Sequence, residues 1–276
     1  MADASITRRE FIERGAMVAA LMSAGRLPLL GQGIVSAATP GPACVQPVTG
    51  YLGGFAPALA GRALGAEYTL AYDIVHWNRT DGKTWVTVND VLGSLRIARS
   101  VSEEGPRYDV EQTMTYSGVE NRLEAAILCN DDELNTLRRW RVKWSASAGG
   151  KPIPQVHLAD HGYAGDGLCR LWPEQPFPVA GPLVSQWTIL DLLARRAGER
   201  TDVCFRLLDD LSRLKEDQHL RYDGQEEIDC ARGHVTLASF LQTGRGIHPR
   251  HYLVDDRGLP QLVTAAMMSW ALRSVG

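Results

Sequence analysis

The sequence of 276 residues predicts a mainly β protein, built as a curved antiparallel sheet or an open or closed β-barrel with one covering helix. Three observations predict this class. About a dozen short segments are rich in β-branched and aromatic residues, turn-forming residues separate them, and one segment alone has convincing helical spacing. A sheet of many short strands avoids open edges by curving towards closure, and the single helix would plug or cover one side.

Residues 1–38 carry the features of a bacterial export signal in their usual order. Arg8, Arg9 and Arg14 come first, the apolar run GAMVAALMSAG follows, and VSAAT offers small residues for cleavage. The stretch TRREFI resembles the twin-arginine export signal. Because the apolar run is shorter than the roughly 20 residues that span a bilayer, we expect residues 1–38 to be removed. The mature protein would then be periplasmic or secreted, with no stable membrane span.

Two other interpretations of this end stay open. The paired arginines could open an amphipathic first helix of a cytoplasmic domain, and Cys44 in PGPAC could become a lipid-bearing first residue, although no leucine stands three positions before it. The twin-arginine signal that this stretch resembles belongs to a system that exports proteins already folded. The resemblance therefore raises the question whether a cofactor is bound before export.

The composition of the remaining chain argues against a nucleic-acid partner. Without residues 1–38 it has 29 acidic and 25 basic residues, whereas nucleic-acid binding needs a basic excess clustered on one face. The remainder is long enough to bury a proper core. The five cysteines permit at most two disulfides or stay as buried thiols, and their spacing disfavours a redox or zinc cluster.

The elements are expected in a simple order. Residues 39–65 are rich in Pro, Gly and Ala and predict an irregular arm, and residues 66–276 predict one β-barrel-like domain. Strand-like segments lie at 68–77, 83–92, 94–101, 108–116, 121–129 and 136–147, and again at 202–210, 218–224, 225–230, 234–242, 250–256 and 260–268. Asp223-Gly224 and Arg257-Gly258 are typical of hairpin turns. In WRVKW, Trp140, Val142 and Trp144 share one face, because side chains alternate along a strand.

A long loop and one helix separate the two sets of strands. Six prolines predict a loop over 149–183. The helix is expected near 185–197, where Ser185 is a fair N-cap, apolar residues recur at helical spacing and Gly198 fits the position after the last turn.

The order of strands, helix and strands ends in YLVDDRGLPQLV. It resembles the secreted open-barrel proteins related to the bacterial lipoprotein carriers, in which a final hairpin carries a turn of the form DD..G.P. The resemblance covers roughly residues 66–272. It implies a concave sheet that receives an apolar ligand.

The sequence lacks a glycine-rich phosphate loop, a G-x-S-x-G elbow and an HExxH zinc helix. Histidines and one aspartate in HLADHGYAGDG and GRGIHPRHY remain as catalytic candidates: His157, Asp160, His161, His248 and His251. Such groups could form general acid–base pairs of a cofactor-independent hydrolase, lyase or isomerase. They could also hold a metal if the two loops meet, or simply bond to the loop backbone. We expect no cofactor and no metal.

Aromatic residues on the predicted strands supply a third kind of candidate. Trp77, Trp85, Trp140, Trp144 and Tyr116 could line the hollow side of the sheet, although core packing is the ordinary role of such residues. The sequence therefore predicts an exported protein that binds an apolar or aromatic small molecule. The alternatives are a cofactor-independent hydrolase, lyase or isomerase and a metal-dependent enzyme with histidine ligands.

Overall fold

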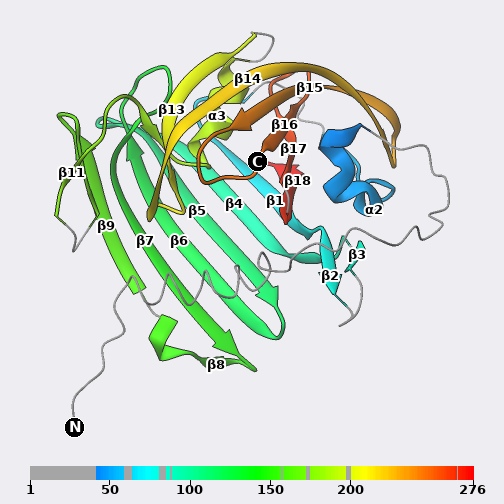
Figure 1. Ribbon diagram of the computed structural model, residues 1–276, viewed down its shortest axis with the longest axis horizontal. Coiled ribbons are helices and arrows are strands. Elements are labelled where there is room, and N and C mark those ends of the chain that lie inside the picture. The colour runs from blue at the N-terminus through cyan, green and yellow to red at the C-terminus, as the bar shows by residue number, and fades with distance from the viewer. Residues whose placement is uncertain are drawn as a thin grey trace.

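The computed structural model describes residues 42–58, 64–80, 85–87, 89–156, 158–171, 175–196, 200–265 and 267–276. Most of them belong to one large curved sheet, which does not close and whose strands pair antiparallel except for β12 with β13 (Figure 1). This confirms the predicted mainly β class. The strand order is β11-β10-β9-β7-β6-β5-β4-β1-β18-β17-β16-β15-β14-β13-β12, and β8 pairs with β7.

The strands of the first half are β1 (Tyr68–His76), β4 (Val91–Ser102), β5 (Gly105–Tyr116), β6 (Val119–Cys129), β7 (Leu137–Ala148), β8 (Lys151–Pro152), β9 (Leu158–Gly165), β10 (Leu168–Leu171) and β11 (Phe177–Pro178). Those of the second half are β12 (Leu183–Val184), β13 (Asp202–Asp209), β14 (Arg213–Cys230), β15 (Gly233–Thr243), β16 (Arg250–Val254), β17 (Pro260–Thr264) and β18 (Met268–Val275). A separate pair is formed by β2 (Asn78–Thr80) and β3 (Trp85–Thr87). The helical elements are η1 (Ala43–Val48), α2 (Thr49–Leu52), η2 (Pro154–Val156) and α3 (Thr188–Arg195).

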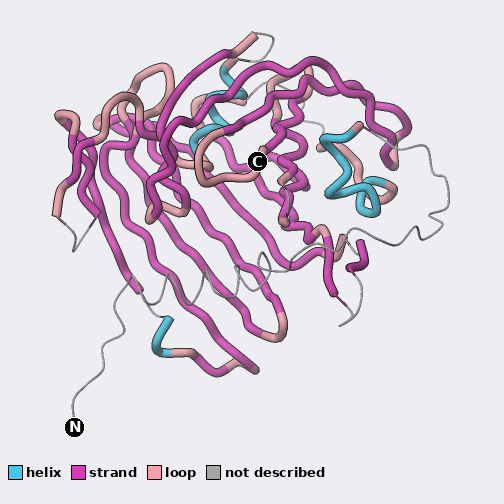
Figure 2. The backbone as a smooth tube through the Cα atoms, viewed as in Figure 1, coloured by secondary structure: helices cyan, strands magenta, loops and turns pink. Residues whose placement is uncertain are grey.

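The sheet bends around helix α3. In Figure 1 the long strands β4 to β7 form one broad wall, β13 to β15 arc over it, and α3 lies between the two. Figure 2 shows how little helix accompanies these strands. Every residue of α3 from Thr188 to Leu193 is buried, including the polar Thr188 and Asp191, so this part of the helix is covered on all sides rather than along one stripe.

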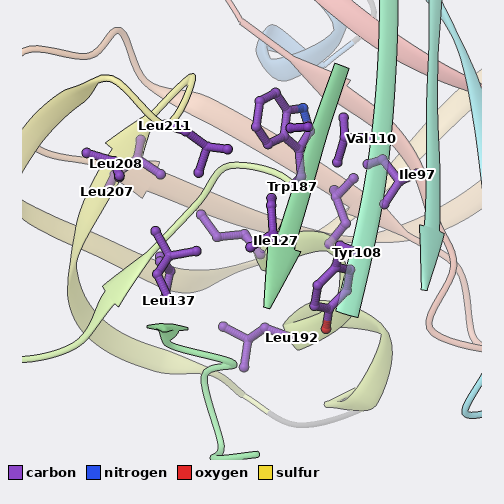
Figure 3. Packing of buried hydrophobic residues seen from close by; sticks show 14 of the residues in the cluster. Ile97, Tyr108, Val110, Ile127, Leu137, Trp187, Leu192, Leu207, Leu208 and Leu211 are labelled. Carbon is purple, nitrogen blue, oxygen red and sulfur yellow. The ribbon is translucent and has the colours of Figure 1, made fainter. Parts of the chain in front are cut away.

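The main core fills the space between α3 and the inner face, by which we mean the face of the sheet towards α3. Figure 3 shows Trp187 and Leu192 packed among side chains of the long strands, such as Tyr108 and Ile127, and those of the β13 end, such as Leu207. Burying one such aliphatic side chain contributes about 1.5–3 kcal/mol. The inner face is therefore the part of the sheet that fixes α3.

A second, smaller core lies on the outer face, the opposite side of the sheet. The segment η1–α2 covers it there, with Val45, Val48 and Leu52 packed against Leu253 and Leu262 of β16 and β17. The stretch predicted as an irregular arm thus contains short helices. All five cysteines are described and none forms a disulfide.

Two local expectations were wrong. The predicted loop over 149–183 contains β8 to β12, strands too short and too rich in glycine and proline to show a period of two. Asp223-Gly224 does not turn the chain, because β14 pairs with β15 on both sides of it. Gly224, at φ 122°, instead forms a bulge between Tyr222↔Phe240 and Gly224↔Ser239.

Helix α3 lies within the stretch expected to be helical. Ser185 acts at its start, where the backbone N–H of Thr188 donates to Ser185 Oγ at 3.2 Å and the N–H of Ser185 donates to Thr188 Oγ1 at 3.2 Å. Gly198 lies outside the described residues.

Candidate functional site

A groove of about 280 Å³ opens on the inner face beside the start of α3. We call it the inner groove. Its apolar wall consists of Ile74, Met114, Val263, Ala265, Met267, Met268 and Trp270, and its polar part of Gln112, Gln186, Asp209, Asp210, His248 and Arg250. Side chains from β1, β5, β17 and β18 therefore meet the turn after β13 and the turn before β16.

The apolar wall follows one row of strand partners. Trp270 is opposite Ile74, Ile74 is opposite Gly93, and Gly93 is opposite Met114, so the row crosses β18, β1, β4 and β5. A Cβ atom at Gly93 would lie 1.9 Å from the carbonyl oxygen of Thr113. Glycine is thus needed for the close approach of β4 to β5 that sets this row.

The polar end is held by an unusual turn between β13 and β14. Asp210 and Leu211 have φ of 49° and 54°, a region that aspartate tolerates and leucine rarely adopts. Leu211 is fully buried in the main core, and its backbone N–H donates to the carbonyl of Leu208 at 3.2 Å. Burial of the Leu211 side chain therefore stabilises the unfavourable backbone conformation of this turn, and the turn places Asp209 and Asp210 at the groove.

The two carboxylates of this turn have different partners. Asp209 forms an ion pair with Arg250, with 3.3 Å between Oδ1 and Nη2. Asp210 Oδ1 accepts a hydrogen bond from Gln186 Nε2 at 2.6 Å, and its backbone N–H donates to Gln186 Oε1 at 2.9 Å. Gln186 precedes α3, so the helix that fills the sheet also fixes the polar end.

The environment of Asp210 disfavours its negative charge. Loss of solvation around the carboxyl and, next, the charge of Asp209 raise its pKa to about 6, although the residue as a whole is exposed. The Gln186 bond and the cations Arg250 and Arg213 oppose this shift without cancelling it. The inner groove thus joins an apolar wall to a carboxyl group that titrates near neutrality.

A larger cleft of about 690 Å³ lies at the other end of α3, lined by Arg99, Asp191 and Arg195 among others. Its charges are engaged with each other. Asp191 accepts hydrogen bonds from Tyr68 at 2.6 Å and from Arg195 at 2.8 Å, and Arg99 Nε lies 3.1 Å away as an ion pair without hydrogen-bond alignment. This network joins the helix to the sheet, and we assign it a structural role.

The structure separates the histidines and the aspartate predicted from sequence. His248 lines the inner groove, whereas His251 points to the outer face, because its neighbour Tyr252 belongs to the main core. Its pKa is lowered by burial. Asp160 and His161 lie in β9 rather than in a loop and point to opposite faces, and seven strands stand between β9 and β16 in the sheet. His157 lies outside the described residues.

The predicted aromatic residues also differ in their surroundings. Trp140 is 1% exposed within the main core, where the backbone of Gly162 rests on its ring. Trp144 is half-buried against that core, away from the groove lining. The ring centroid of Tyr116 lies 5.5 Å from that of His76. Tyr116 is in β5 with Met114, and His76 is in β1 with Ile74. Trp77 is half-buried. The side chain of Trp85 lies outside the described set.

Sequence reasoning missed most of the groove residues, including Asp209, Asp210, Arg250 and Trp270. The doublet Asp209-Asp210 at the end of a strand pattern was the available signal. Within the described part of the chain, no three His, Cys, Asp or Glu side chains group as metal ligands. No helix in that part is long and apolar enough to cross a membrane.

No protein-family model matches the chain, and no curated protein matches it. Among solved structures it is similar to a β-barrel-like protein of the domain of unknown function DUF1849 from Brucella abortus, at 10% identity with a TM-score of 0.49. The match covers 80% of this chain and 98% of that one.

Proposed function

We propose that the protein is exported and that it binds an apolar or aromatic small molecule in the inner groove. The observation that carries the proposal is the row Trp270, Ile74 and Met114, an apolar wall that ends at polar groups. Ligand sites in proteins are typically concave, mostly apolar and supplied with a few placed polar groups. Methionine side chains adapt to irregular ligands, and three of them line this groove.

Binding can be screened through stability. A ligand that binds only the folded protein raises the unfolding midpoint, so lipids, sterols, terpene-like compounds and sugars are tested in a thermal-shift series on the protein without residues 1–38. A hit is then followed in two matched variants, Trp270→Ala and Trp144→Ala. Both tryptophans are half-buried strand residues, but only Trp270 lines the groove.

We expect Trp270→Ala to weaken binding at least about tenfold, which corresponds to about 1.4 kcal/mol, and Trp144→Ala to leave it unchanged. Equal losses in both variants, or no hit in the whole screen, would count against the inner groove as the binding site.

A cofactor-independent hydrolase, lyase or isomerase is the second candidate. Asp209, Asp210 and His248 line the same groove, and a carboxyl with a raised pKa beside an ionisable neighbour is a frequent arrangement for acid–base chemistry. If turnover of a hit is found, His248→Ala should abolish it and His161→Ala should not. Normal turnover in His248→Ala would remove that histidine from the mechanism.

A further inference from the structure

Resting on the proposed function, we propose that the ligand of the inner groove carries a protonated amine at its polar end, and that Asp210 selects it. The class is an amphipathic ammonium compound with one alkyl or aromatic body.

Asp210 is the groove residue best placed to meet a cationic head. Its side chain accepts from Gln186, but among the described residues no Arg, Lys or His nitrogen forms an ion pair with it. The other groove carboxylate, Asp209, already has Arg250 as its ion-pair partner. Asp210 also lines the groove, so a group bound there lies next to it.

The charges around the groove also favour a cationic head. The ionisable groups of the groove lining are two carboxylates, one guanidinium and the imidazole of His248, and Arg213, whose charge also acts on Asp210, is not part of that lining. An ammonium head would neutralise Asp210 and would relieve its repulsion by Asp209. A carboxylate head would meet both aspartates. Arg250 pairs with Asp209 through Nη2, and although its buried Nη1 has no hydrogen-bond partner, this one guanidinium faces two carboxylates. Charge complementarity therefore favours a cation over an anion.

The apolar wall of the groove extends far enough to receive the body of such a ligand. Met268 is 40% exposed although it belongs to the groove wall, and it pairs across strands with His76, which contacts Tyr116. The apolar surface thus continues from the groove towards the ends of β1 and β5. An extended apolar body can follow this surface while its head stays at Asp210.

The test uses three probes with the same tail: octylamine, 1-octanol and octanoate. Their affinities for the full chain are measured at pH 7.5 by displacement of a fluorescent apolar reporter. We expect octylamine to bind at least about tenfold more tightly than octanoate.

Asp210→Asn should lower the affinity for octylamine about tenfold and leave 1-octanol within about twofold, because asparagine keeps the turn geometry and removes the charge. Asp166→Asn is the matched control. Asp166 also occupies a turn with positive φ, 52° against 49° for Asp210, but lies between β9 and β10.

The amine preference is overturned if octanoate binds as tightly as octylamine, or if Asp210→Asn binds octylamine like the unaltered protein. In either case 1-octanol still binds, and the proposed groove function stands. If none of the three probes binds, the groove function fails and the amine preference fails with it.

Discussion

Replacing Asp191 by alanine tests whether the helix inside the sheet is held by its buried charge. The Asp191 side chain is 2% exposed, and that of its ion-pair partner Arg99 is 10% exposed. Tyr68 and Asn135 each donate a hydrogen bond of 2.6 Å to the same carboxylate. Asp191→Ala leaves a nearly buried guanidinium and two buried donors without their shared acceptor.

Breaking a buried ion pair from one side costs about 3–5 kcal/mol. For a domain of this size, 1 kcal/mol shifts the midpoint of thermal unfolding by about 2–4 °C. We therefore expect the midpoint of Asp191→Ala to fall by roughly 6–20 °C in calorimetry. Glu133→Ala is the control, because Glu133 pairs with Arg196 while its side chain is 86% exposed, and such pairs contribute at most about 1 kcal/mol. A loss in Asp191→Ala no larger than in the control would refute the structural role of the network.

Three further outcomes follow from other parts of the chain. Gly162→Ala should lower the free energy of unfolding by about 1–3 kcal/mol in urea denaturation, because the new Cβ would lie 2.3 Å from Cζ2 of Trp140. An unchanged free energy of unfolding would show that the Trp140 ring can move aside without cost. Because folding raises the pKa of Asp210 to about 6, its charge is penalised in the folded state as pH rises from about 4 to above 6. Over that pH window the unaltered protein should lose stability relative to Asp210→Asn, as measured by thermal melts of both proteins at each pH. If the unfolding midpoints of the two proteins change equally with pH, the raised pKa of Asp210 is contradicted. Finally, replacing Arg8 and Arg9 by lysine should leave the unprocessed chain in the cytoplasmic fraction of the cells. Continued cleavage and export of this variant would disprove the hypothesis of a twin-arginine signal.

The sequence predicts the fold well where a strand has one apolar and one polar face. WRVKW in β7 is such a case: Trp140 and Val142 are buried in the main core, while Arg141 and Lys143 are exposed. The stretch 149–183 fails because strands of two to four residues show no measurable alternation, and β9 carries glycines and polar residues instead.

The groove could not be predicted, because its wall depends on which strands become neighbours. Ile74, Met114 and Trp270 look like ordinary core residues in sequence and meet only through the pairing of β18, β1, β4 and β5. Asp210 looks like a residue of a solvated turn, and its role depends on the contact with Gln186, which is 24 positions away. Histidine spacing was misleading for the same reason, since it carries no information on which face of a sheet each residue occupies.

The most direct test of the account is to locate a bound molecule. An eight-carbon alcohol that carries a photoreactive diazirine on its tail is irradiated with the protein, and the labelled peptides are mapped by mass spectrometry. Binding in the inner groove predicts labels around Met114 on β5 and around Met268 and Trp270 on β18, with protection by unlabelled 1-octanol. Labels confined to outer-face residues, or spread over the sheet without protection, would contradict the claim that the inner groove is the binding site.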